Sequence, residues 1–181
     1  RYGLTPTVTF TPTGQTTMTL RYEYLHDSRT ADRGLTSFQG LPADVDVTTY
    51  FGDPDGSRVN ADVHVASGTV AHQVGALMLR NHTLVANYDR SYQNFVPGVV
   101  TASKAHVTLT AYNNATRRPN LFNQTDFTRR FVADGVSHTV LAGVELGRQL
   151  TDNFRNTGYF GSATSVQVPY LNPLTSAASF R

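Results

Sequence analysis

The fold class is decided by the stretch TTMTLRYEY at residues 16–24. Large apolar and aromatic side chains alternate there with polar ones, and a period of two residues is typical of a β-strand whose two faces meet different surroundings. One face carries Met18, Leu20, Tyr22 and Tyr24, and the other carries Thr17, Thr19, Arg21 and Glu23. The sequence therefore predicts a strand over residues 16–26 with one apolar and one polar face.

Five other segments have the composition of strands, being rich in Thr, Val, Tyr or Phe. They are residues 7–11, 59–72, 77–89, 106–131 and 136–149. In the second of these, one face carries Val59, Ala61, Val63 and Val65 and the other carries Asn60, Asp62 and His64; in the last, one face carries Val136, Val140, Ala142, Val144 and Leu146. In residues 77–89, apolar and polar side chains alternate too weakly for the two faces of the strand to be assigned. A break is expected near Arg118-Pro119, because proline cannot donate a hydrogen bond to a ladder.

The connections between these strands alternate between short and long. Short turns are expected at residues 12–15, 73–76 and 133–135, and long loops at 27–58, 90–105 and 150–181. All the long loops then lie at one end of the strands. This asymmetry is typical of outer-membrane β-barrels, which have short periplasmic turns and long extracellular loops. A soluble β-sandwich that binds ligands through loops at one end is the alternative.

The composition narrows the class of protein further. The chain has 181 residues, no cysteine and a formal net charge of +2. These values exclude a disulfide framework and a thiolate metal site, and they do not indicate a nucleic-acid partner. No segment approaches the roughly 18 consecutive apolar residues of a membrane helix. If the protein lies in a membrane it must therefore form a barrel, because only helices and closed barrels pair every backbone group in lipid.

Several segments resemble the barrel of TonB-dependent siderophore receptors. They are YGLTPTVTF at 2–10 with the turn and the YEY that follow it, DRGL at 32–35, NYDR and YQN within 87–94, FNQTDF at 122–127, and HTVLAGVE at 138–145. The last is the most telling, because it resembles a strand that recurs in the family after a short periplasmic turn. The resemblance covers nearly the whole chain, in order.

The resemblance implies an all-β fold, namely about six antiparallel up-and-down strands of a transmembrane barrel of about 22 strands whose lumen holds a plug domain. It implies a receptor in the bacterial outer membrane, surrounded by lipid, that binds ferric siderophore and is driven by TonB acting on the plug. Iron enters this picture only as ferric siderophore, with no resident cofactor and no enzymatic activity. No plug, TonB box or closing strand is recognisable in residues 1–181, so this range is expected to be part of a barrel domain.

Candidate ligand-binding residues lie in or near the expected long loops. Arginines donate hydrogen bonds to anionic or carbonyl-rich chelates, and aromatic rings form walls around them. The candidates are Arg29, Arg33 and Tyr50 in the first loop, and Arg90, Tyr92, Gln93 and Phe95 near the second. The first loop has six aspartates and three arginines, whereas the second has Arg90 and Lys104 and no acidic residue. An anionic ligand would therefore be attracted more strongly by the second loop.

Two other groups of polar residues could suggest a metal site, and neither predicts one. Asp53-Pro54-Asp55-Gly56 has carboxylates suited to calcium, but the remaining ligands of a calcium loop are absent, and a turn is the better interpretation. Asp62, His64 and His72 share a predicted face without a further ligand converging on them.

Three other classes of protein remain as alternatives. A passive pore or autotransporter barrel would share the strand pattern without a plug, and a soluble β-sandwich would stay dissolved without detergent. An outer-membrane hydrolase would need a nucleophile with a partner histidine, and no motif of that kind is recognisable in the sequence.

Overall fold

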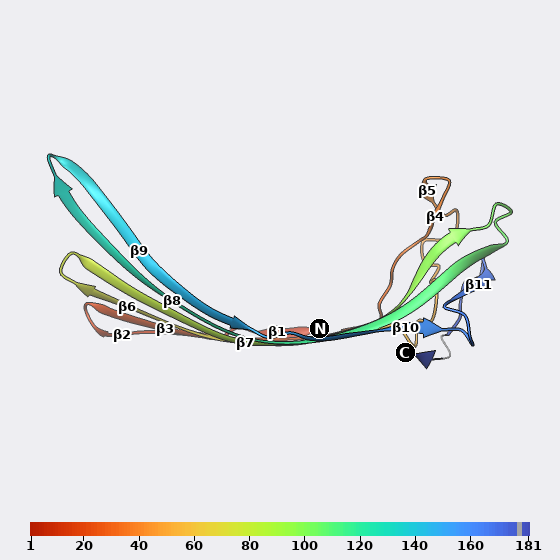
Figure 1. Cartoon of the computed structure of the whole chain (residues 1–181), viewed down its shortest axis with the longest axis horizontal. Helices are drawn as coiled ribbons and strands as arrows, with labels where there is room; N and C mark the ends of the chain where they lie inside the picture. The colour runs from red at the N-terminus through yellow and green to blue at the C-terminus, as the bar shows by residue number, and fades with distance from the viewer. Residues whose placement is uncertain (177–178) are drawn as a thin grey trace.

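A computed structural model describes residues 1–176 and 179–181 of the chain. Over these residues the regular structure is a 10-stranded antiparallel sheet and a separate two-stranded hairpin. Figure 1 shows the sheet as a single curved layer, with hairpins at its left end and loops at its right end. The predicted all-β antiparallel fold is thereby confirmed. No helix in the described residues is long and apolar enough to cross a membrane.

The strands of the sheet are mostly longer than the sequence predicts. The first part of the chain forms β1 (Tyr2–Leu4), β2 (Thr7–Thr13), β3 (Thr16–Arg29) and β6 (Arg58–Val74). The remainder forms β7 (Leu77–Val100), β8 (His106–Ala133), β9 (Val136–Gln149), β10 (Asp152–Tyr159), β11 (Ser165–Pro169) and β12 (Ser179–Phe180). The separate hairpin consists of β4 (Ser37–Phe38) and β5 (Leu41–Pro42).

Apart from the short β12, these segments occupy six positions across the sheet. The segments β1 and β2 both pair with β3, and β9, β10 and β11 all pair with β8. Between these outer positions the order is β3-β6-β7-β8, and the short β12 lies next to β10. The expected number of strands therefore agrees with the structure over the described residues.

Tight turns close three hairpins at one end of the sheet, as predicted. Gly75 has a φ of 56° in the β6–β7 turn, and Asp134 and Gly135 have φ values of 51° and 74° in the β8–β9 turn. Positive φ at both central residues is the type I′ geometry, whose twist matches that of the flanking strands. The Asp-Gly pair thus selects the tight hairpin that joins the last two long strands.

The predicted second long loop is wrong. Strand β7 continues to Val100 instead of ending at residue 89, and the connection to β8 is only residues 101–105. Residues on β7 remain paired with β8 as far as Pro97 opposite Leu109, and a bulge follows before Val100. The side chains of 90–100 alternate poorly, so pairing with a long partner strand, and not periodicity, determines where β7 ends.

The predicted break at Arg118-Pro119 is also wrong, because β8 runs through Pro119 without interruption. The proline carbonyl accepts a hydrogen bond from the Leu150 N–H at 3.2 Å. The interruption lies instead in the chain that pairs with β8 on this side, because β9 ends at Gln149 and β10 begins at Asp152. The sheet therefore accommodates the proline by an irregularity in the partner strand.

The tail from residue 150 is not a single long loop, contrary to the prediction. It contains β10, β11 and β12. The first of these continues the line of β9 along β8, with Asp152 opposite Arg117 and Thr157 opposite Tyr112. Its pairing partner lies far away in the sequence, which is why local patterning does not reveal it.

The register gives the sheet one apolar face in its short-turn half, because directly opposite residues point to the same side. This face is defined by the exposed side chains of Val8, Phe10, Leu20, Val70, Val85, Leu121, Phe127, Val140, Val144 and Leu146. The opposite, polar face carries Thr19, Arg21, Glu23, Arg80, His82, Gln124 and Glu145 at the same level. Leu146 is 69% exposed and Leu121 is 49% exposed. The monomeric sheet thus presents a band of uncovered apolar side chains.

The apolar face changes character toward the long-loop end. Tyr24 lies opposite His64, and His26 lies opposite Asp62. The predicted apolar side of 16–26 and the predicted polar side of 59–72 are therefore one face of the sheet. Its apolar band ends near Tyr22, and polar side chains continue beyond it.

Among the residues that the structure describes, a small core lies at the long-loop end. It consists of Ala43, Phe51, Val100, Val107, Leu109, Val168 and Tyr170. Three of these come from the ends of β7 and β8, and two come from the first long loop, which spans residues 30–57. The loop therefore folds back onto the strand ends, and its β4–β5 hairpin rises from the sheet at the right of Figure 1.

We expect Gly52→Ala to release this loop from the sheet. Gly52 has a φ of 125°, and an added Cβ would overlap the ring of Phe95. Its N–H donates to Pro173 O at 2.9 Å, and its carbonyl accepts from Thr175 N–H at 2.9 Å. Left-handed strain at such a site costs about 1–3 kcal/mol. Limited proteolysis should cut within residues 30–57 faster in this variant than in Gly14→Ala, where a Cβ would meet open space. Equal cleavage rates would contradict the role of Gly52.

Candidate ligand-binding site

Tyr112 of β8 is the centre of a cluster of aromatic and cationic side chains on the polar face. Its ring meets the ring of Tyr92 edge to face, with centroids 5.7 Å apart. The guanidinium carbon of Arg155 lies 3.9 Å from the Tyr112 ring centroid. Arg33 donates a hydrogen bond from Nη2 to the Tyr112 hydroxyl at 2.8 Å. Two cationic groups and two aromatic rings therefore converge on one point.

Three strands and one loop bring these residues together. Tyr92 is on β7, Tyr112 on β8 and Arg155 on β10, while Arg33 belongs to the first long loop. In the ladder, Tyr92 and Arg155 both lie opposite Asn114. The three strand residues therefore share the polar face. The loop adds Arg33 from outside the sheet, so the cluster exists only when the loop is folded back.

An open hollow of about 770 Å³ adjoins the cluster. It lies between the β4–β5 hairpin and the end of β7, and it is lined by Arg33, Leu35, Phe38, Val96, Pro97 and Val99 among others. The volume falls within the range of small-molecule sites, about 300–1,000 Å³. Lys104 lies 5.2 Å from the Phe38 ring centroid. Arg33 and Arg155 can donate hydrogen bonds to an anionic ligand, and the hollow offers it apolar and aromatic walls.

The predicted site residues do not all meet in this cluster. Arg33 and Tyr92 join it, and Arg90 lies on the same face of β7 one alternation below Tyr92. Arg29 is the last residue of β3 and donates to Asp27 at 3.3 Å. Tyr50 donates to the carbonyl of Ala31, which joins two parts of the first long loop.

The other two predicted residues have structural contacts. Gln93 points to the other face and donates to Gly56 O at 2.7 Å. Phe95 is 3% exposed and meets Phe160 edge to face. Both lie on β7 and not on a loop, because the second loop is short.

Sequence reasoning missed Tyr112 and Arg155. Tyr112 lies inside a segment that was expected to be a plain strand, and Arg155 lies in the tail that was expected to be a loop. Their proximity to Tyr92 depends on the β7–β8 and β8–β10 registers. The spacing of aromatic and basic residues along the paired strands could have indicated the cluster. That spacing can be interpreted only when the register of the strands is known.

The two groups considered for metal binding make ordinary protein contacts. The Asp53 carboxylate accepts the N–H groups of Asp55 at 3.0 Å and Gly56 at 2.9 Å, so the predicted turn is confirmed. Asp62 bonds to His26 and His64 bonds to Tyr22. Within the part of the chain that the structure describes, no three His, Asp or Glu residues converge as metal ligands do.

The fold matches solved structures of siderophore receptors. One is the siderophore receptor PiuA from Acinetobacter baumannii, with a TM-score of 0.81, 22% identity and 99% of this chain covered. Another is the ferric-catecholate import receptor Fiu from E. coli K12, in a closed form with a TM-score of 0.74 and an open form with 0.75, at 19% identity and 99% coverage. The chain has the fold of a siderophore-receptor barrel segment. No protein-family model and no curated protein matches it by sequence.

The siderophore-receptor fold is present here in part. The chain spans 29% of the PiuA chain and 28% and 31% of the two Fiu chains. A segment of that size supplies a portion of a barrel wall, which agrees with the open, curved sheet of Figure 1. The neighbours are transport receptors and not enzymes.

We expect the hydrogen bond that Tyr50 makes within the first long loop to weaken at strongly alkaline pH. Burial raises the pKa of the Tyr50 hydroxyl above its usual value. The neutral hydroxyl stabilises the folded loop fully at pH values below the pKa that Tyr50 has in the unfolded state. This stabilisation is lost as the pH rises through the higher pKa that Tyr50 has in the folded state. Proteolysis within residues 30–57, measured against pH, should accelerate above about pH 10. The acceleration should be absent in Tyr50→Phe, whose loop is looser at every pH because its hydrogen bond to Ala31 O is lost, and it should persist in Tyr92→Phe. If proteolysis of Tyr50→Phe accelerated by the same amount at alkaline pH, ionisation of Tyr50 would not be the cause.

Proposed function

We propose that this chain is part of the barrel wall of a bacterial outer-membrane receptor that takes up ferric siderophore in a TonB-dependent manner. The observation that carries the proposal is one sheet with an uncovered apolar band, short turns at one end and a cluster of aromatic and cationic side chains at the other. Lipid would cover the band, and the polar face would line the lumen. TonB would act through a plug domain, as in the family that the sequence resembles.

The chemistry of the cluster favours an anionic, aromatic chelate. Arg33 and Arg155 place two positive charges on the Tyr112 ring and hydroxyl, and Arg90 lies on the same face. Catecholate oxygens around iron are acceptors for guanidinium N–H groups, and catechol rings can stack on tyrosine rings. Fiu is a ferric-catecholate import receptor, and this likeness supports a ferric catecholate as the substrate class. Iron is the cargo, and no resident cofactor is proposed.

Deletion of the gene should abolish uptake of a particular ferric siderophore. Iron-starved cells supplied with labelled ferric catecholate should accumulate iron when they carry the gene, and should fail to do so without it. Inactivation of TonB should produce the same loss in cells that carry the gene, because transport through a plugged barrel needs work on the plug. Uptake that continues without TonB would instead indicate a passive pore.

Removal of one guanidinium from the cluster should weaken ligand binding. A hydrogen bond to a charged group is worth about 1.5–3 kcal/mol, so Arg33→Ala or Arg155→Ala should raise the Kd for ferric catecholate by roughly 10- to 100-fold. Arg130→Ala is the matched control, since Arg130 lies on the same face of β8 near the short-turn end. Binding to purified protein in detergent can be followed by tyrosine fluorescence quenching. Equal affinities for all these variants would remove the cluster from the binding site.

A further inference from the structure

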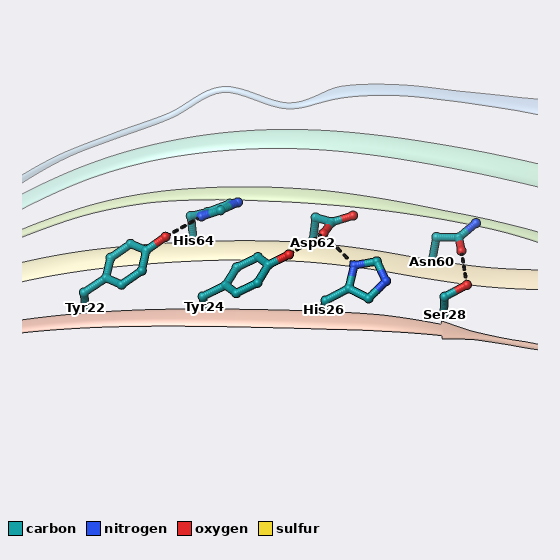
Figure 2. A network of polar contacts seen from close by, with 7 residues as sticks. All are labelled: Tyr22, Tyr24, His26, Ser28, Asn60, Asp62 and His64. Atoms are coloured by element: carbon teal, nitrogen blue, oxygen red, sulfur yellow. Dashed lines mark hydrogen bonds and ion pairs between the residues drawn. The ribbon is translucent and has the colours of Figure 1, made fainter. Parts of the chain in front are cut away.

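A second polar cluster lies on the apolar face, beyond the end of the apolar band (Figure 2). It spans β3 and β6 with Tyr2 of β1 beside them, and it shares no residue with the candidate ligand-binding cluster on the opposite face. The Tyr22 hydroxyl and His64 Nδ1 are 2.7 Å apart, and the Tyr24 hydroxyl donates to Asp62 Oδ1 at 3.3 Å. His26 Nδ1 lies 2.8 Å from the same Asp62 oxygen.

Two pairs of closely packed rings lie beside one carboxylate in this cluster. The rings of Tyr24 and His64 have centroids 4.8 Å apart at 30°, and those of Tyr2 and His26 have centroids 4.9 Å apart at 30°. The Tyr2 residue is 60% exposed and the Asp62 side chain is 46% exposed. Such a surface can pack the C–H groups of a sugar ring against aromatic faces while the carboxylate accepts sugar hydroxyls. A phosphate would meet the like charge of Asp62.

An apolar groove begins where this cluster ends. Its volume is about 420 Å³, and its lining includes Pro6, Val8, Leu20, Ala66, Gly68 and Val85. Tyr22 belongs to both the groove lining and the polar cluster. Gly68 lies between Leu20 and Thr83 in the ladder, and its missing side chain deepens the groove. An acyl chain fits these apolar walls, which are continuous with the exposed band.

We propose that the groove and the cluster form one glycolipid site, with an acyl chain in the groove and the sugar head group on the rings around Asp62. The site rests on the proposed function, because the groove faces lipid only in a membrane barrel. The aromatic and histidine rings then lie at head-group level, where amphipathic rings gather in membrane proteins. The head group is held by ring contacts and by the Asp62 carboxylate, and its specificity is for uncharged sugar over phosphate.

Native mass spectrometry of the full-length protein tests the site. The protein is released from a detergent without sugar groups, after addition of digalactosyl diacylglycerol or dioleoyl phosphatidylethanolamine. Wild-type protein should retain the glycolipid in preference to the phospholipid. Gly68→Leu fills the groove, and Asp62→Ala removes the carboxylate; each should lower glycolipid retention by about tenfold. Val144→Leu enlarges an apolar side chain elsewhere on the same face and should have no effect.

Ferric-siderophore binding measured on the same samples separates the two proposals. Selective glycolipid retention that is lost in Gly68→Leu and Asp62→Ala, with ferric-siderophore binding unchanged, supports the site. Equal retention of both lipids, or retention unaffected by both substitutions, overturns the glycolipid site and leaves the receptor proposal standing if ferric siderophore still binds. A protein that binds neither ferric siderophore nor lipid overturns both proposals.

Discussion

The hydrogen-bonded register of the long antiparallel ladder is the constraint on which the rest of the structure depends. The sheet is one layer, and the described residues have a packed core only at the loop end. Elsewhere, backbone pairing between neighbouring strands holds the sheet together. The β3–β6 ladder pairs Thr16 with His72 through to Arg29 with Val59 without a shift. A slip of one residue would exchange the two faces along a whole strand.

The same constraint explains how polar groups are tolerated within the apolar band. Asn81 and Thr83 lie on the apolar face of β7, opposite Thr125 and Asn123 of β8. Asn81 donates to Thr125 at 2.8 Å, and Asn123 donates to Thr83 at 2.7 Å. The side chains satisfy one another across the ladder, so they need no water. A polar patch within an apolar face is acceptable when the register places donors beside acceptors.

Local signals in the sequence were sufficient for the hairpins and for the faces of β3. The alternation in residues 16–24 and the Asp134-Gly135 turn act over a few residues, and both predictions agree with the structure. The end of β7 and the strands of the tail could not be predicted, because partner strands distant in sequence determine them. For the same reason the sequence reveals Arg33 and Tyr92 as members of the candidate cluster, but not Tyr112 and Arg155. Tyr92, Tyr112 and Arg155 become neighbours only through two registers.

Arg33 raises a different question, because no ladder positions it. Its hydrogen bond to Tyr112 joins the loop to the sheet, and the loop is held independently by Phe51 and Ala43 in the small core. Guanidinium has several N–H donors, so one bond to Tyr112 leaves others for a ligand. Because the core holds the loop without a ligand, Arg33 is already oriented, and less ordering entropy would be lost if a ligand bound there as proposed. The apolar contacts of the loop are thus a condition for the position of the Arg33 charge beside Tyr112, and under the proposed function residues that do not touch the ligand would affect its binding.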